Sequence, residues 1–388
     1  MKKLSLVAAC ASAVLLTACS DVEVENFETS KSNAINFHVV GNSSQTKATP
    51  ITPDNLNTTD FDVFAFTEDG IAFMGDNNAD WAHTGVKIIN NGGLWDYNNP
   101  DELRYWPEIT TPLNFYAVNP GTTTEGFDTH YAWNINHNSQ QILYAMTDEY
   151  ASDNGHPNHD VMYAIAKNQT KDTNNGVVDL KFHHTLSQIV FQAKTQYAGM
   201  EVDINYIKIH NVKFSGIFDF PEEDKHATAD NWTLYEIQDL GDQRGNAFTV
   251  VRTKNDDNQA TKQIIVNSNV EATDITSATP MLMLPQALRP WAVETENPTK
   301  YQADNAHECY LEISCKIKQK GVYILGSESE YKTIFVPFSA IWNPGYRYVY
   351  TLIFGGGYDE HGDKILTPIT FDAETFVWDD EPTDNVTF

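Results

Sequence analysis

The feature that most constrains this chain is a succession of short segments rich in β-branched and aromatic residues. They lie at 34–40, 61–66, 113–118, 188–194, 204–214, 263–267, 309–317, 333–338, 346–354 and 369–378. Such segments favour β-strands, and the Asn, Asp, Gly and Pro clusters between them favour turns. No long stretch combines the helical period with capping residues. The sequence therefore predicts an all-β protein, and its 388 residues suggest two β-sandwiches in series.

The division between these sandwiches is expected near the middle of the chain. The polar stretch 192–206 separates two runs of predicted strands. We therefore predict one domain over residues 34–197 and a second over residues 198–388. Each half is long enough to bury a core of its own.

The N-terminus, MKKLSLVAACASAVLLTACS, combines a basic start, an apolar run and small residues before Cys19. The run is too short to span a bilayer, so the pattern indicates a secretory signal peptide over residues 1–18. The small residues before Cys19 also form a lipobox, which predicts cleavage there and acylation of this cysteine. Residues 19–33 would then be a lipidated tether, with each buried acyl methylene contributing about 0.8 kcal/mol to membrane anchoring. An ordinary signal peptide that contains Cys19 is the alternative.

The net charge excludes some classes of binding partner, and the spacing of the cysteines argues against a disulfide. A formal net charge of −28 argues against nucleic acid and against docking on anionic lipid through charge. Cys309 and Cys315 share the inward face of a predicted strand. Because six residues of strand span about 20 Å, we expect two buried thiols and no disulfide.

Several local features could carry chemistry, but each has a simpler explanation. Residues 156–160 (HPNHD) offer two imidazoles and a carboxylate to a metal, yet they also read as a polar turn. Residues 355–364 (GGGYDEHGDK) follow a strand and precede another, which favours a hairpin loop over a phosphate cradle. The acidic run 222–224 could belong to a hydrolase, although such runs are usually solvated. We expect no catalytic residues, no metal and no cofactor.

The adjacent histidines His183 and His184 also suggest a catalytic or metal-binding site. On a continuing strand they point to opposite faces, so they cannot jointly bind one metal without a bend. No other motif places an acidic partner beside them. We expect one of them to pack at a strand turn with a backbone hydrogen bond.

The tryptophans suggest a glycan-binding function. Trp81, Trp95, Trp106 and Trp133 lie in or beside predicted loops, where exposed rings could stack on sugars. A surface glycan-binding lipoprotein of a polysaccharide-capture system is therefore an alternative function for this chain.

The order of motifs along the mature chain resembles the fimbrillin-like family, the type V pilins and related lipoproteins of Bacteroidia. The matching stretches are AINFHVV, QTKAT, FDVFAF, YWPEITTPLNFYAVNP, DVMYAIA, LKFHHTLSQIVFQAK, IHNVKFSGIFDF, TPMLMLPQ, WNPGYRYVYTLIF and ITFDAETFVWDD. The resemblance implies two tandem transthyretin-like β-sandwich domains. It also implies a lipidated precursor exported to the cell surface, and the acidic residues after Cys19 resemble surface-export signals of Bacteroidetes-type bacteria.

The family resemblance further implies assembly by donor-strand exchange. The removable first strand would be 34–40, with Ile35, Phe37 and Val39 filling a groove that a strand of the next subunit later occupies. The cleavage bond would be Lys47–Ala48, where the family usually has Arg before Ala, so an Arg-specific protease should not cut after Lys47. An uncut anchor or accessory subunit is the alternative. The donor would be the C-terminal tail, through Val386 and Phe388.

These expectations define a non-catalytic pilus subunit or cell-surface adhesin. Its partners would be other fimbrillin-like subunits, the outer membrane through the lipid on Cys19, and a host or bacterial surface receptor or glycan. Its location would be the outer membrane at the cell surface, or the fimbria itself.

Overall fold

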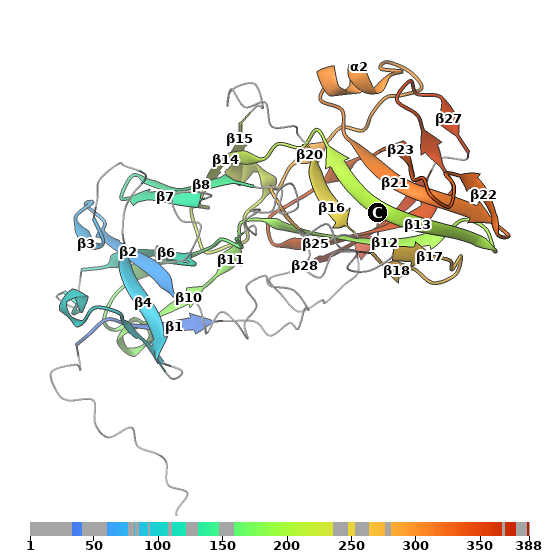
Figure 1. Ribbon diagram of the computed structural model, residues 1–388. Coiled ribbons are helices and arrows are strands. Elements are labelled where there is room, and N and C mark those ends of the chain that lie inside the picture. Colours follow the sequence, from blue (N-terminus) through green and yellow to red (C-terminus); the bar gives the residue numbers. More distant parts are fainter. Residues whose placement is uncertain are drawn as a thin grey trace, which may run out of the picture.

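The computed structural model describes residues 33–40, 60–76, 81, 85–91, 94–107, 111–121, 131–146, 159–235, 247–252, 264–275, 281–366, 369–377 and 386–387. Strands dominate these residues, and the prediction of an all-β protein is confirmed (Figure 1). The predicted signal peptide, Cys19 and the predicted tether up to residue 32 lie outside the described residues.

The N-terminal sheet is the first layer of the fold. Its strands are β1 (Asn36–Val40), β2 (Phe61–Thr67), β3 (Ala72–Met74), β4 (Val86–Asn91), β5 (Leu94–Tyr97), β6 (Leu113–Asn119), β9 (Met162–Gln169), β10 (Val177–Lys181) and β11 (His183–His184). They run in the order β10-β1-β5-β4-β2-β6-β9-β11, and β3 pairs with β2. A short 3-10 helix, η1 (Pro100–Glu102), follows β5, and another, η2 (Thr173–Gly176), precedes β10.

A bridging sheet covers one face of the N-terminal sheet. It consists of β7 (Tyr131–Asn136), β8 (Ser139–Ala145), β14 (Ser215–Asp219) and β15 (Trp232–Leu234), in the order β15-β14-β8-β7. The 3-10 helix η3 (Ala229–Asn231) leads into β15. Tyr163 of the N-terminal sheet packs on Phe218 of this sheet, with 5.1 Å between ring centroids.

Two further sheets pack face to face in the C-terminal half. The central sheet contains β12 (Ser187–Thr195), β18 (Thr273–Asp274), β19 (Met281–Met283), β25 (Tyr346–Phe354), β28 (Thr370–Val377) and β29 (Val386–Thr387). The outer sheet contains β13 (Met200–His210), β16 (Phe248–Arg252), β17 (Ile264–Val266), β21 (Tyr310–Gln319), β22 (Val322–Leu325), β23 (Lys332–Pro337), β26 (Gly357–Tyr358) and β27 (Lys364–Ile365). A small pair, β20 (Ala287–Leu288) and β24 (Ala340–Ile341), and one short helix, α2 (Lys300–Asn305), complete the described elements.

Strand β2 shows how the sequence produces this layering. Phe61, Val63 and Ala65 enter one core, whereas Phe64 and Phe66 enter another on the opposite face. Successive side chains of a strand point to opposite faces, so a strand buried on both faces is apolar almost throughout. The continuous run FDVFAF is therefore the pattern of a strand between two packed layers.

The N-terminal sheet curls around its own core. The rings of Phe37 on β1 and Phe115 on β6 lie 6.1 Å apart, although three strands separate β1 from β6 in the sheet. Four strand spacings in a flat sheet would place them about 19 Å apart. The curl encloses an apolar core that β1 and β10 complete.

Strand pairing connects both sides of the domain boundary expected at residue 198. Strand β12 precedes that residue and pairs in parallel with β25. Strand β14 follows it and pairs antiparallel with β8. The division into residues 34–197 and 198–388 therefore stays a prediction, and it does not coincide with a division between sheets.

The cysteine prediction is confirmed. Cys309 and Cys315 are both free and fully buried. The hairpin prediction for 355–364 is also confirmed, because β26 and β27 pair antiparallel across that loop. The hairpin formed by β7 and β8, in which Asn136 pairs with Ser139, is absent from the strands that the sequence predicts.

Candidate strand-insertion site

Strand β1 occupies an unusual place in the N-terminal sheet, because it lies between β10 and β5 and, among the described strands, it alone connects β10 to the sheet. Its five residues pair in parallel with β10, from Asn36 opposite Val177 to Val40 opposite Lys181. On its other side, Phe37 pairs antiparallel with Trp95 of β5. Among the described strands, β1 is the only one that pairs with β10. Without β1, a gap one strand wide would separate β5 from β10.

The inward side chains of β1 fill this gap. Ile35 and Phe37 are buried, and Val39 packs against the same core while partly exposed. The Phe37 ring lies 6.2 Å from the rings of Phe61 and Tyr97, in edge and tilted arrangements that aromatic pairs prefer. The alternation expected for 34–40 is present, whereas the removal of this strand stays a prediction.

Backbone hydrogen bonds fix the start of the strand. The N–H of Ile35 donates to the carbonyl of Arg104 at 2.9 Å, and the Tyr97 hydroxyl donates to the carbonyl of Ile35 at 3.1 Å. Burial raises the pKa of the Tyr97 hydroxyl, so it stays a donor. The Trp106 N–H donates to the carbonyl of Asn33, and the indole N–H of Trp106 donates to the carbonyl of Gly176. Trp106 thus connects the segment before β1 to η2, which precedes β10.

The other predicted site residues fall in different places. Lys47, Ala48 and Phe388 lie outside the described residues. Val386 belongs to β29, which pairs antiparallel with β28, where Thr375 lies opposite Val386. The cleavage and donor roles of these residues stay predictions.

The histidines acquire partners that the sequence did not reveal. His183 Nε2 lies 2.7 Å from Asp224 Oδ1, and His184 Nδ1 lies 2.9 Å from Asp160 Oδ2. Both histidines are buried. No sequence motif indicated these carboxylates, because each comes from a segment distant in sequence from its histidine.

The residues considered for metal binding do not gather into a ligand shell within the described ranges. His156 lies outside them, Asp160 is engaged with His184, and the carbonyl of His159 accepts from the Tyr144 hydroxyl at 2.8 Å. No group of three or more His, Cys, Asp or Glu side chains that could hold a metal occurs in the described part of the chain.

Two of the four tryptophans proposed for exposure are buried, which corrects that prediction. Trp133 is fully buried in the core between the N-terminal and bridging sheets, and Trp106 is buried in the core that contains Ile35 and Phe37. Trp95 is half-buried, with its ring 5.0 Å from that of Phe61. A loop position in the sequence is a poor guide here, because Trp133 lies in β7 and not in a loop.

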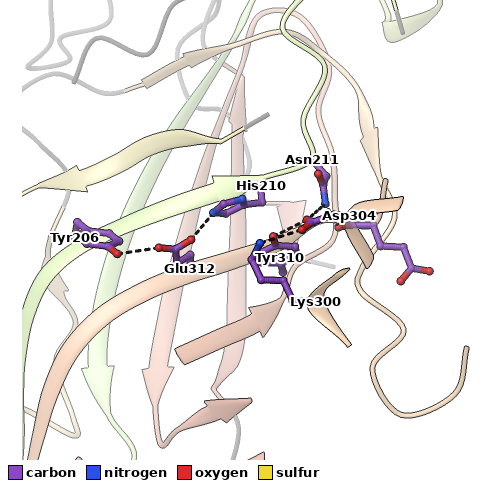
Figure 2. A network of polar contacts seen from close by, with 8 residues as sticks. Tyr206, His210, Asn211, Lys300, Asp304, Tyr310 and Glu312 are labelled. Carbon is purple, nitrogen blue, oxygen red and sulfur yellow. Dashed lines mark hydrogen bonds and ion pairs between the residues drawn. The ribbon is translucent and has the colours of Figure 1, made fainter. Parts of the chain in front are cut away.

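A polar network fastens α2 to the outer sheet (Figure 2). Asp304 of α2 accepts hydrogen bonds from the Tyr310 hydroxyl at 2.7 Å and from Asn211 Nδ2 at 3.1 Å. On the next part of the sheet, Glu312 accepts from the Tyr206 hydroxyl and lies against His210 Nε2, each at 2.8 Å. The His210 ring stacks on that of Tyr310, which joins the two groups. We interpret this network as structural, since its carboxylates accept from neighbouring side chains of the fold.

The network predicts acid sensitivity. Burial raises the pKa of Glu312, but hydrogen bonds from His210 and Tyr206 outweigh it and lower the pKa to about 2 from 4.5. The depressed pKa contributes stability that is present above pH 4.5 and is lost as the pH falls towards 2, roughly 2–3 kcal/mol in all.

Urea unfolding between pH 7 and pH 2 tests the predicted contribution of Glu312 to stability. The difference in unfolding free energy between the parent and Glu312→Gln should be largest near neutral pH and shrink through that window. Tyr206→Phe removes only one of the two hydrogen-bond partners of Glu312, so this variant should lose only part of the pH-dependent stability. A pH-independent difference would contradict the assignment.

Among the described residues, no helix is long and apolar enough to cross a membrane.

Comparison with known proteins places the chain in a family. A family described as fimbrillin-like matches residues 46–375. The structure is similar to that of a fimbrial protein from Bacteroides vulgatus, with a TM-score of 0.58 and 16% identity over 89% of this chain and 99% of that one. It also aligns with the tip fimbrial protein Mfa3 from Porphyromonas gingivalis, with a TM-score of 0.39 and 10% identity over 81% of this chain and 93% of that one. None of the curated proteins matches. Because the family match covers most of the sequence, this protein belongs to the fimbrillin-like family.

Proposed function

We propose that this protein is a surface-exposed fimbrial subunit or cell adhesin that assembles by donor-strand exchange and has no catalytic role. The family and the similar fimbrial protein support the fimbrial or adhesive role. The observation that carries the exchange mechanism is the position of β1, which alone among the described strands pairs with β10. A lipid on Cys19 would hold the chain at the outer membrane, and other fimbrillin-like subunits would be its partners.

The physical basis of the exchange is the gap that β1 fills. A strand from a second subunit could restore the main-chain hydrogen bonds to β10 and place alternate apolar side chains where Ile35 and Phe37 lie. Each such side chain contributes about 1.5–3 kcal/mol when it leaves water. Head-to-tail insertion does not close on itself, so repeated exchange would produce a filament.

Cleavage with a lysine-specific protease tests the proposal. A cut after Lys47 separates β1 from the rest of the chain and should convert monomer into multimers that form a ladder on unboiled gels. Lys47→Gln is the matched control, because Lys31 remains cleavable but a cut there leaves β1 attached. An Arg-specific protease should produce no ladder by cutting at this bond. Protein that is cut after Lys47 and stays monomeric would count against a polymerising subunit.

A further inference from the structure

The hairpin formed by β21 and β22 ends the molecule opposite to β1. Gln319 pairs with Val322 across a two-residue turn. The turn residues Lys320 and Gly321 both have positive φ, 50° and 81°, as a type I′ hairpin turn requires. In Figure 1, β22 lies at the far right of the fold and β1 at the left. This hairpin is therefore remote from the proposed strand-insertion site.

On one edge of β22, no strand of the described residues lies beside it. Within the described part of the chain, β22 pairs only with β21. The strand reads Val-Tyr-Ile-Leu, with no charge and no proline, and Val322 and Ile324 are 67% and 40% exposed. Proteins usually protect free edges with charges, prolines or bulges, because unpaired N–H and C=O groups attract another strand. The only irregularity here is a register shift on the side that faces β21.

The charges that flank β22 are arranged in opposite senses at its two ends. Lys320 lies two residues before the strand, and Glu328 lies three residues after it; both are exposed. Neither side chain takes part in an ion pair with the described residues. If two copies align their β22 strands antiparallel, the start of each strand lies beside the end of the other. Lys320 of each copy then approaches Glu328 of the other, twice by symmetry.

We propose that the free edge of β22 is a self-association site, where two copies of this chain pair antiparallel about a two-fold axis. Backbone hydrogen bonds join the two edges, Val322 and Ile324 lose contact with water, and the flanking charges select the antiparallel orientation. The strand is short, so the contact belongs with small, transient interfaces, with a Kd between about 10 µM and 1 mM. The contact is independent of β1 and could link subunits side by side.

Sedimentation equilibrium of the intact protein over a range of concentrations tests the proposal. Ile324→Lys places a charge on the edge and should weaken dimerisation by at least about tenfold. Ile341→Lys is the matched control, since Ile341 is 70% exposed on β24, away from this edge. It should leave the dimer unchanged. Circular dichroism of each variant shows that the fold is retained.

A charge exchange tests the orientation. Lys320→Glu and Glu328→Lys should each weaken the homodimer by like-charge repulsion. The double variant, and an equimolar mixture of the two single variants, should restore it, because each then brings opposite charges together. The proposal is overturned if the parent is monomeric up to about 1 mM. That result would leave the edge to a different extended partner. A dimer that Ile324→Lys and the charge variants leave intact would overturn it equally.

Discussion

Replacing Phe37 by alanine is expected to lower the free energy of unfolding by about 3–5 kcal/mol. The ring lies within 6.2 Å of the ring centroids of Phe61, Tyr97 and Phe115, and the side chain is only 6% exposed. Its removal leaves a cavity where the curled sheet closes on itself. Urea unfolding monitored by tryptophan fluorescence measures the loss.

The neighbouring residue provides the control. His38 points outward and pairs with Asp179 at 2.9 Å, with its side chain 64% exposed. His38→Thr should change stability by at most about 1 kcal/mol, since exposed ion pairs contribute little. If Phe37→Ala lowers the free energy of unfolding by no more than His38→Thr does, Phe37 of β1 does not pack in the core as described. Under the strand-exchange proposal, the weaker packing of β1 in the Phe37→Ala variant should also favour replacement of β1 once the chain is cut after Lys47.

The second large effect is expected at Glu308, a fully buried carboxylate in the segment that precedes β21. Its Oε1 accepts hydrogen bonds from Arg289 and from Asn297 Nδ2, and its Oε2 accepts from the backbone N–H of Ala292 at 2.9 Å. Glutamine can offer an oxygen to only one side, so its amide would face a donor on the other. Glu308→Gln should therefore destabilise by about 3 kcal/mol, because a buried donor loses its partner.

Glu296 is a matched control because it contacts the same arginine. Its Oε2 lies 3.3 Å from Arg289 Nη2, but its side chain is 71% exposed. Glu296→Gln should cost only a few tenths of a kcal/mol. Thermal unfolding of both variants beside the parent compares them directly. Equal effects would show that the contact with Arg289, and not the burial of Glu308, sets the stability.

Features that depend on residues close together in the sequence are predictable from the sequence, whereas contacts between distant residues are not. Patterns contained in one short segment are predictable: the inward cysteines of residues 309–317, the alternation of Ile35, Phe37 and Val39, and the double-sided apolar run of β2. Side-chain alternation depends only on the local geometry of a strand, so the sequence shows it directly. The order of motifs along the chain likewise indicates the fimbrillin-like family, because that order is a property of the sequence alone.

Interactions between distant segments are not predictable in this way. His183 meets Asp224 and His184 meets Asp160 because loops bring them together, and no local pattern records such an approach. The sequence places Trp133 beside a loop, since the strands of the β7–β8 hairpin carry too many polar residues to stand out. The boundary expected at residue 198 assumes that neighbouring strands stay in one layer, whereas β12 and β14 each pair across it.

The sequence by itself determined the all-β class, the family and the inward faces of 34–40 and 309–317, since these follow from local periodicity and motif order. Only the tertiary structure decided that β1 alone pairs with β10 among the described strands, that Glu308 is enclosed by donors, and that the edge of β22 stays open within the described part of the chain. These depend on which strands become neighbours. That choice is made by long-range burial of apolar faces and pairing of backbone groups across the whole fold.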